Sequence, residues 1–436
     1  MYQIWTGPQA SRLHYGPQAA HTHDFAVRDK YIEPLPGRPY LGNQKRRQLM
    51  TRRYDLDWLR VIAFSILILF HTGMMFNTWD WHIKNNQTTE SMEDVMAFIG
   101  QWRMPLLFFI SGAAVWFALG RYPARKFARE RVQRLLVPLI FGMFVIVPPQ
   151  VYLERVFRGV SFHSYWGFYA TVVEFHPYPQ GNFSWHHLWY IPYIFVFSFL
   201  ALPLFLYLKT PRGRNAITRI LEWIKRHNAL LLLGIPLAVS EISLRPFWQA
   251  NANNLVADWA QFSTTLLLFI TGYVLASYDP IWEAIERYRF RALGFGLLTM
   301  SAVMLFWIAD QELAPFPRAL YRFCRSMNIW CWVLCLLGFG KKHLSRNHPF
   351  LKYANEAVYP FYIVHQTITI MIGFPLIPLP WSIGAKFAIV CSGTFFLSWL
   401  VYEGIRRMNW TRVLFGLKAR RRFDSQLAQK RAFAEV

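Results

Sequence analysis

The chain has 436 residues, of which 54% are hydrophobic and 18% aromatic, and only 16% are charged. This composition argues against an ordinary soluble protein of two or three domains and predicts one polytopic membrane domain. The formal net charge of +23 would suit a nucleic-acid partner. No basic stripe belongs to a soluble module, however, so nucleic-acid binding is not expected.

Apolar stretches with the length of membrane-spanning helices recur from residue 55 to residue 403. We predict an all-α polytopic fold of about ten transmembrane helices in one bundle, with both termini in the cytosol. In this topology most of the 47 Lys and Arg lie on the cytosolic side, as the positive-inside bias requires. The predicted spans cover residues 55–77, 95–119, 135–153, 187–208, 229–245, 260–278, 292–310, 324–340, 354–376 and 381–403.

The two ends of the chain differ from the membrane domain, which we place at residues 49–405. Residues 1–48 are polar and lack the apolar core of a signal peptide, so they predict a disordered cytosolic arm. Met50 stands directly before TRRYDLDWLR and is a second candidate, beside Met1, for the initiating residue. Residues 406–436 predict a basic cytosolic tail that lies against anionic lipid.

The first span carries two polar side chains in the run RVIAFSILILFH. Arg60 and His71 lie eleven residues apart, about 16 Å along a helix axis, so they share one face. An ionisable residue in a span is costly and indicates a functional site. Asp57 can orient the guanidinium of Arg60, and the imidazole of His71 suits a general base. We expect Arg60 and His71 to open on one passage; the alternatives are a snorkelling Arg60 and a His71 that bonds a neighbouring helix.

The first outer loop and the second span contain further candidates. Trp79, Trp81 and His82, in TWDWHIKNN, suit stacking against a sugar face, or equally an ordinary aromatic belt at the membrane interface. Arg103, in WRMPLLFFISG, lies level with His71 by residue count. Its guanidinium suits an oxyanion or an acyl carboxylate, with an interfacial anchor as the alternative.

Two later spans contain histidine. His187 begins the span at 187–208, at the level of the outer vestibule. His365, with Tyr362, is a polar group in the middle of the span at 354–376, where it suits either an interhelical hydrogen bond or a site residue. The four cysteines are spaced as packing residues, so no metal site is predicted.

Several of these segments together resemble the acyltransferase 3 family of integral-membrane O-acyltransferases. The opening D-x-x-R-x10-H of residues 57–71 is similar to the family's opening signature, and RVQRLLVP at 131–138 is similar to its R-x-x-R segment. WRMPLLFFISG, HLWYIPYIFVF and YPFYIVHQTI also occur in the family's order. TWDWHIKNN resembles the branch that contains the glucan succinyltransferases. The resemblance covers residues 53 to about 405.

The resemblance implies that a succinyl or acetyl group moves from cytosolic acyl-CoA across the bacterial inner membrane to a hydroxyl of a periplasmic or surface glucan or other polysaccharide. Acyl-CoA is then a co-substrate, and no tightly bound cofactor is implied. The role of His71, as base or as transient acyl carrier, stays open. The implied site residues are His71, Arg60 and Asp57 for catalysis, Arg131 and Arg134 with Arg60 for the donor, and Arg103, Trp81, His82, His187 and His365 for the acceptor or the oxyanion.

Two other classes of protein also place polar groups in spans. A transporter or flippase for an anionic or lipid-linked substrate would show internal repeats or paired broken spans, and neither is convincing here. A glycosyltransferase with a lipid-linked donor calls for outer-loop carboxylates, and the outer loops offer no Asp/Glu pair in apolar surroundings. The sequence therefore favours an O-acyltransferase whose partners are the bilayer, acyl-CoA and a carbohydrate.

Overall fold

The computed structural model describes residues 52–248, 254–308 and 314–420; the predicted arm at 1–48 lies outside these ranges. Apart from one isolated bridge between Pro177 and Phe183, the described residues contain helices and no β pairing. Within them, nine helices are long and apolar enough to cross a membrane, or ten if the bent pair α8 and α9 forms one span. The predicted all-α membrane fold is confirmed, and the cytosolic placement of the termini stays a prediction.

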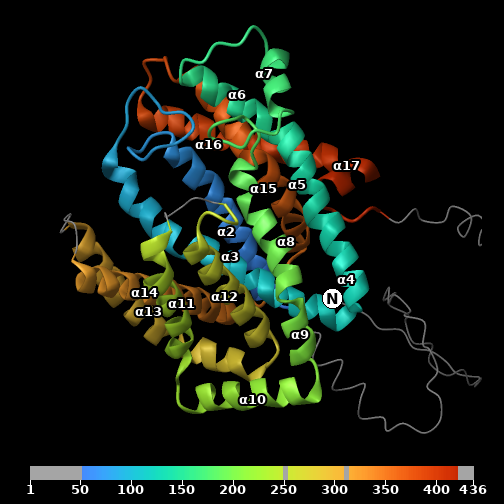
Figure 1. Ribbon diagram of the computed structural model, residues 1–436, viewed down its shortest axis with the longest axis vertical. Coiled ribbons are helices and arrows are strands. Elements are labelled where there is room, and N and C mark those ends of the chain that lie inside the picture. The colour runs from blue at the N-terminus through green and yellow to red at the C-terminus, as the bar shows by residue number, and fades with distance from the viewer. Residues whose placement is uncertain (1–51, 249–253, 309–313, 421–436) are drawn as a thin grey trace, which may run out of the picture. The chain divides into compact units, whose positions relative to one another are not determined.

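The first half of the chain supplies the helices and short turns around the candidate site (Figure 1). Between α4 and α6 the chain passes through two π-helical segments, η2 and η3, so that residues 124–157 form one continuous helical rod, which contains an apolar stretch long enough to cross a membrane. The elements are α2 (Tyr54–Met74), η1 (Glu90–Met92), α3 (Glu93–Arg121), α4 (Ala124–Arg131), η2 (Val132–Leu136), α5 (Val137–Phe141), η3 (Gly142–Ile146), α6 (Val147–Phe157), α7 (Tyr165–Val172), η4 (His186–Trp189), α8 (Tyr190–Leu200) and α9 (Leu202–Leu208).

The second half supplies the remaining spans and two short helices at their ends. Helix α15 packs against α2, α6 and α16 and so brings its middle to the site. The elements are α10 (Pro211–Arg226), η5 (Leu230–Gly234), α11 (Ile235–Leu244), η6 (Arg245–Phe247), α12 (Trp259–Ala276), α13 (Pro280–Ile308), α14 (Pro315–His343), α15 (Pro349–Leu376), α16 (Ile383–Ile405) and α17 (Asn409–Leu414).

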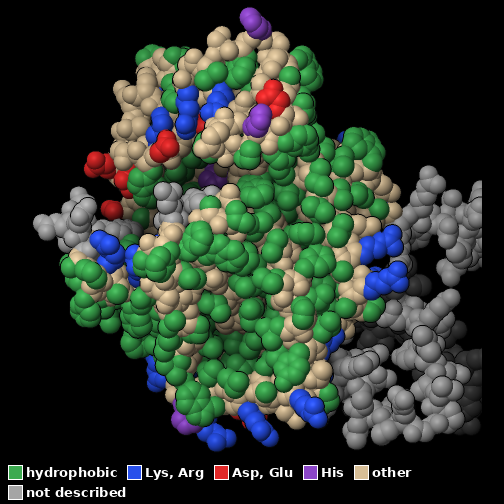
Figure 2. Space-filling model, in the orientation of Figure 1, with side chains coloured by type: hydrophobic (Ala, Val, Ile, Leu, Met, Phe, Trp, Pro, Cys, Tyr) green, Lys and Arg blue, Asp and Glu red, His purple; other side chains and the backbone are tan. Residues whose placement is uncertain are grey.

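The basic connection at 209–228 forms the amphipathic helix α10. Apolar residues recur every three to four positions, and Ile217, Leu221 and Ile224 are buried on one face. Helix α10 crosses the end of the helical unit opposite to α7 (Figure 1). Hydrophobic side chains cover the middle of the face seen in Figure 2, and Lys and Arg gather along α10. This distribution agrees with a helix lying at a membrane surface.

Helices α3 and α12 cross with their backbones in direct contact. A Cβ atom added at Gly112 would overlap the carbonyl of Phe269, and one added at Gly272 would overlap the carbonyl of Phe109. Small residues allow this approach, which is how helices commonly associate in membranes. The crossing fixes α3, and with it the height of Arg103 in the bundle.

Two lysines fasten the outer loop that follows α2. Lys84 Nζ donates to the carbonyls of Met74 and Trp79 at 2.7 and 2.9 Å, and its burial lowers its pKa. Lys386 on α16 is fully buried and donates to Asn85 Oδ1 at 2.8 Å. The loop that carries Trp81 and His82 is therefore tied to the end of α2 and to α16.

The first part of the predicted C-terminal tail is packed against the bundle. Thr411 and Arg412 of α17 are buried, and so are Phe415 and Leu417 after it. The guanidinium of Arg412 donates to both carboxylate oxygens of Glu356 on α15, at 2.9 and 3.2 Å. This bidentate pair anchors the segment to the same helix that carries His365.

Candidate functional site

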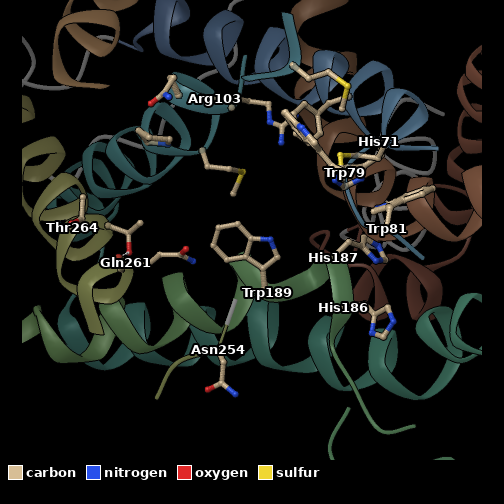
Figure 3. A pocket seen from close by; sticks show the side chains of 18 of the residues that line it. His71, Trp79, Trp81, Arg103, His186, His187, Trp189, Asn254, Gln261 and Thr264 are labelled. Carbon is tan, nitrogen blue, oxygen red and sulfur yellow. Dashed lines mark hydrogen bonds between the residues drawn. The ribbon is translucent and has the colours of Figure 1, made fainter. Parts of the chain in front are cut away.

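A cavity of about 1430 Å³ lies between the helices and the loops that follow α2 and α7. Figure 3 shows side chains of α2, α3 and the segment before α8 pointing into it, with His71, Arg103 and Trp189 around one hollow. A cavity of this volume is of the size that takes ligands larger than a single small metabolite. Among the residues that line it are His71, Trp79, Trp81, His82, Arg103, His187, Trp189 and Gln366.

Hydrogen bonds fix the tautomer of His71. Nδ1 of His365 faces the carbonyls of Tyr362 and Phe361 at 2.8 and 3.2 Å, and since carbonyls only accept, this nitrogen carries a proton. In the neutral ring, Nε2 of His365 is then an acceptor, and it lies 2.9 Å from Nδ1 of His71. Nδ1 of His71 must therefore donate, which leaves the lone pair on Nε2 of His71. That nitrogen is the basic and nucleophilic atom of the ring.

His187 is held by its neighbours on both sides. Its Nε2 lies 2.9 Å from the carbonyl of Ile363 and donates to it, and its Nδ1 accepts from Gln150 Nε2 at 3.1 Å. Gln150 Oε1 accepts in turn from Gln366 at 3.0 Å. Both ring nitrogens of His187 are thus engaged within the protein. His187 lines the cavity with its edge and fixes α15 at the level of His365, although the sequence suggested contact with the acceptor.

Arg103 is a buried cation whose hydrogen-bonding capacity is largely unused. Its side chain is 5% exposed, and its carbon Cζ lies 4.0 Å from the ring centroid of Phe70. Nε and Nη1 are buried and have no hydrogen-bond partner among the described residues. A guanidinium in this state is strongly favoured to bind an anion that enters the cavity, because its desolvation is otherwise uncompensated.

Arg60 and His71 lie on one face of α2, as predicted, but they do not open on one passage. Arg60 does not line the cavity. Between the two side chains pack the buried aromatic residues Phe64, Tyr190 and Tyr362, with ring centroids 5.3 to 6.4 Å apart. The expectation of a continuous passage between Arg60 and His71 is therefore wrong. The residues that separate them come from three helices that are distant in the sequence, so their contact could not be expected from the pattern of α2 alone. We call Phe64, Tyr190 and Tyr362 the aromatic layer.

On the other side of the aromatic layer, three guanidinium groups gather. Asp57 Oδ1 lies 3.6 Å from Nη2 of Arg60, which also donates to Asn355. Arg131 and Arg134 lie close enough to Arg60 or to each other for mutual electrostatic repulsion. Arg131 lies over the ring of Phe127, and Arg134 donates to the carbonyl of Gly416 at 3.1 Å. The predicted donor residues are thus brought together, and such a concentration of cations suits a polyphosphate. We call Arg60, Arg131 and Arg134 the guanidinium cluster.

The outer part of the cavity is aromatic. Trp81 stands between two histidines, with its ring centroid 6.4 Å from that of His71 and 5.4 Å from that of His82. Trp79 lines the same cavity, and so does Trp189, which the sequence analysis had not selected. Half-exposed indole rings in a cavity offer flat apolar faces to a sugar ring.

A buried carboxylate, also not selected from the sequence, organises the cavity mouth. Glu154 is fully buried on α6, and its Oε2 lies 2.7 Å from Nδ1 of His82 and 3.4 Å from Nε2 of His186. Its Oε1 accepts from the hydroxyl of Tyr178 at 2.7 Å. Burial, reinforced by this carboxylate, raises the pKa of Tyr178 to about 12. Gln150 lies in the predicted span at 135–153 and Glu154 follows that span directly; their spacing of four residues is the polar signal that marks this face of α6.

Comparisons with known proteins identify relatives of the chain. A family described as an acyltransferase domain matches residues 53–403. The chain is similar to glucans biosynthesis protein C of Escherichia coli (strain K12), with 22% identity over 338 residues, which are 75% of this chain and 84% of the relative. The protein of the same name from Shigella dysenteriae serotype 1 (strain Sd197) matches with the same identity and coverage. No solved structure is significantly similar to the chain.

Proposed function

The chain belongs to this acyltransferase family, and from that premise we propose that it transfers an acyl group from cytosolic acyl-CoA to a hydroxyl of a periplasmic or surface glucan. The proposed location is the bacterial inner membrane, where both substrates can be reached. The observation that carries the proposal is the pairing of His71 with His365, which leaves a basic nitrogen at a cavity lined by tryptophans. The name of the relatives supports a glucan as the acceptor.

The donor is proposed to bind on the side of the guanidinium cluster. Acyl-CoA carries its phosphates at one end and its thioester at the far end of an extended arm. Arg60, Arg131 and Arg134 would hold the phosphates, while the arm crosses the aromatic layer and brings the thioester to His71. Two reactions use Nε2 of His71: removal of the acceptor's proton, or attack on the thioester carbon. A thioester is already activated, so a positioned imidazole and a donor to the oxyanion suffice.

The direct test supplies purified protein in lipid nanodiscs with radiolabelled succinyl-CoA or acetyl-CoA and a periplasmic glucan or simple oligosaccharide. We expect label to appear in an ester of the carbohydrate, and CoA to be released in equal amount. Protein that binds acyl-CoA but forms no carbohydrate ester with either donor would contradict the proposed function.

Arg103 is expected to select an acyl group that ends in a carboxylate. Its unpaired nitrogens suit a bidentate ion pair, so Arg103→Gln should lower kcat/KM for succinyl-CoA about 10- to 100-fold, which corresponds to loss of a charged hydrogen bond. Transfer from acetyl-CoA should change little. Steady-state rates with the two donors decide the matter. An equal loss with both donors would instead make Arg103 the group that stabilises the oxyanion.

Charge reversal at the donor cluster should weaken acyl-CoA binding. In the double variant Arg131→Glu and Arg134→Glu, we expect KM for acyl-CoA to rise about 100-fold or more, because each charged contact with a phosphate contributes about 1.5 to 3 kcal/mol. The KM for the carbohydrate should stay the same. The matched control is Arg219→Glu on α10, an exposed basic residue outside the cluster. An unchanged donor dependence would show that Arg131 and Arg134 serve only membrane topology.

A further inference from the structure

His82 and Glu154 form a carboxylate–imidazole pair at the mouth of the cavity. Nδ1 of His82 lies 2.7 Å from Glu154 Oε2, and the carboxylate is fully buried. Because a carboxylate only accepts, Nδ1 donates, and the lone pair of the neutral ring lies on Nε2. The side chain of His82 is 19% exposed and lines the cavity. A buried carboxylate in this position fixes the tautomer of an imidazole and stabilises the cation that forms when the ring takes up a proton.

The surroundings hold this pair rigidly. Glu154 Oε1 is occupied by the Tyr178 hydroxyl at 2.7 Å and by Arg158 at 3.1 Å, so Oε2 is turned toward the histidines. His186 stacks on His82 with ring centroids 4.7 Å apart and an interplanar angle of 16°. Nδ1 of His186 lies 2.6 Å from Ser184 Oγ. These contacts hold the ring of His82 against Glu154 and in the stack with His186.

The same three side chains form a group with the composition of a metal site. One ligand atom each of His82, Glu154 and His186 lies within 4.8 Å of the others. Ring nitrogens of both histidines lie at Glu154 Oε2, 2.7 and 3.4 Å away, so the carboxylate oxygen itself occupies the point toward which the two imidazoles are directed. The guanidinium of Arg158 on the same carboxylate also disfavours a cation. The geometry therefore favours hydrogen bonding over metal binding.

Two candidate bases face one aromatic side chain. The ring of Trp81 adjoins both His71 and His82, so a sugar that stacks on Trp81 has its hydroxyls near both imidazoles. The partner of His71 is a neutral imidazole, whereas the partner of His82 is a carboxylate. The second arrangement stabilises a protonated ring far better. An imidazole that carries an acyl group on Nε2 can no longer take up the acceptor's proton at that nitrogen, and its Nδ1 is turned to His365.

We propose that His71 carries the acyl group and that His82, oriented by Glu154, is the base that deprotonates the acceptor. The proposal rests on the proposed function. In the first step Nε2 of His71 attacks the thioester carbon, the C–S bond breaks, and the CoA thiolate leaves and is protonated by water. The proton on Nδ1 of the acylated ring passes to Nε2 of His365, which lies 2.9 Å away.

In the second step the acceptor hydroxyl oxygen attacks the carbonyl carbon of the acyl group, and its proton passes to Nε2 of His82. The C–N bond breaks, the ester is released, and His365 returns its proton to Nδ1 of His71. The imidazolium of His82 then gives its proton to water at the cavity mouth. The sum of the two steps is acyl-CoA plus alcohol giving ester plus CoA. Glu154 acts through His82 and is a positioning residue.

The experiment separates the two steps. Full-length protein in nanodiscs is mixed with radiolabelled acyl-CoA, CoA release is followed with a thiol reagent, and label is measured on protein and on oligosaccharide. His82→Gln and Glu154→Gln should each release about one CoA per protein and keep the label on the protein. Transfer to the oligosaccharide should fall about 100-fold or more. Glu154→Asp should regain part of the transfer, and His163→Gln, an exposed outer-loop histidine, should behave as wild type.

The outcomes are distinguishable. Wild-type transfer by His82→Gln would overturn the proposal, and so would a requirement for acceptor before any CoA is released. If both His82→Gln and Glu154→Gln lost the initial CoA release as well as the transfer to oligosaccharide, the group of His82, Glu154 and His186 would have a structural role. That result would also overturn the proposal. Stoichiometric zinc in the purified protein, lost in His82→Gln, would make the cluster a metal site instead. Absence of CoA release from the wild type even with acceptor present would contradict the proposed function itself.

Discussion

His71→Ala is expected to reduce transfer of the acyl group to the acceptor by about 10³-fold or more while the protein stays folded. The change removes the one imidazole nitrogen that the His365 contact leaves basic at the deep end of the cavity. The structural cost is small, because the lost hydrogen bond is a single neutral one, worth about 1 kcal/mol. Rates with saturating acyl-CoA and oligosaccharide measure the effect.

The appropriate control for His71→Ala is Ser65→Ala on the same helix, which removes only a hydroxyl bonded 3.0 Å from the carbonyl of Val61. Both variants should elute as monodisperse protein and unfold at similar temperatures. Turnover of the His71 variant at the wild-type rate would show that His71 is not catalytic and would remove the main support for the chemistry proposed here.

Gly112→Val and Gly272→Val are each expected to destabilise the protein by about 3 kcal/mol or more. An added Cβ would lie 1.7 Å from the Phe269 carbonyl oxygen in the first variant and 1.9 Å from the Phe109 carbonyl oxygen in the second. Both obstacles are backbone atoms, so no rotamer change relieves the overlap and α3 must separate from α12. Thermal unfolding in detergent and the yield of monodisperse protein measure the effect.

Gly120→Ala provides the matched comparison on α3, because an added Cβ there meets nothing within 4 Å. This variant should be as stable as the wild type or slightly more stable, since alanine favours the helix by about 1 kcal/mol over glycine. If the valine variants at Gly112 and Gly272 matched it in stability, the close crossing of α3 and α12 would be wrong.

The sequence was sufficient for features that depend on one helix. Hydropathy located the spans, and the spacing of Arg60 and His71 placed both on one face of α2. The start of α13 at Pro280 was missed by twelve residues relative to the predicted span at 292–310. A charged amphipathic run there extends the helix beyond its apolar part, and hydropathy reports only that part.

Features that depend on several helices could not be read from the sequence. The tautomer of His71 depends on a residue 294 positions away, and the aromatic layer joins α2, α8 and α15. Glu154 directly follows a predicted span, a position where a glutamate is common and usually exposed. Only the structure shows that it is buried and that it contacts His82. Pairwise contacts over such separations are set by packing, which local patterns do not encode.

The aromatic layer also has a consequence for the cell that would house this enzyme. A catalyst that receives one substrate from each side of a membrane risks becoming a leak for protons and small ions. Phe64, Tyr190 and Tyr362 are each less than 9% exposed and place a packed aromatic layer between the guanidinium cluster and the cavity. Under the proposed function, the layer would limit such a leak while the cavity is hydrated, and the pantetheine arm of the donor would have to part the seal.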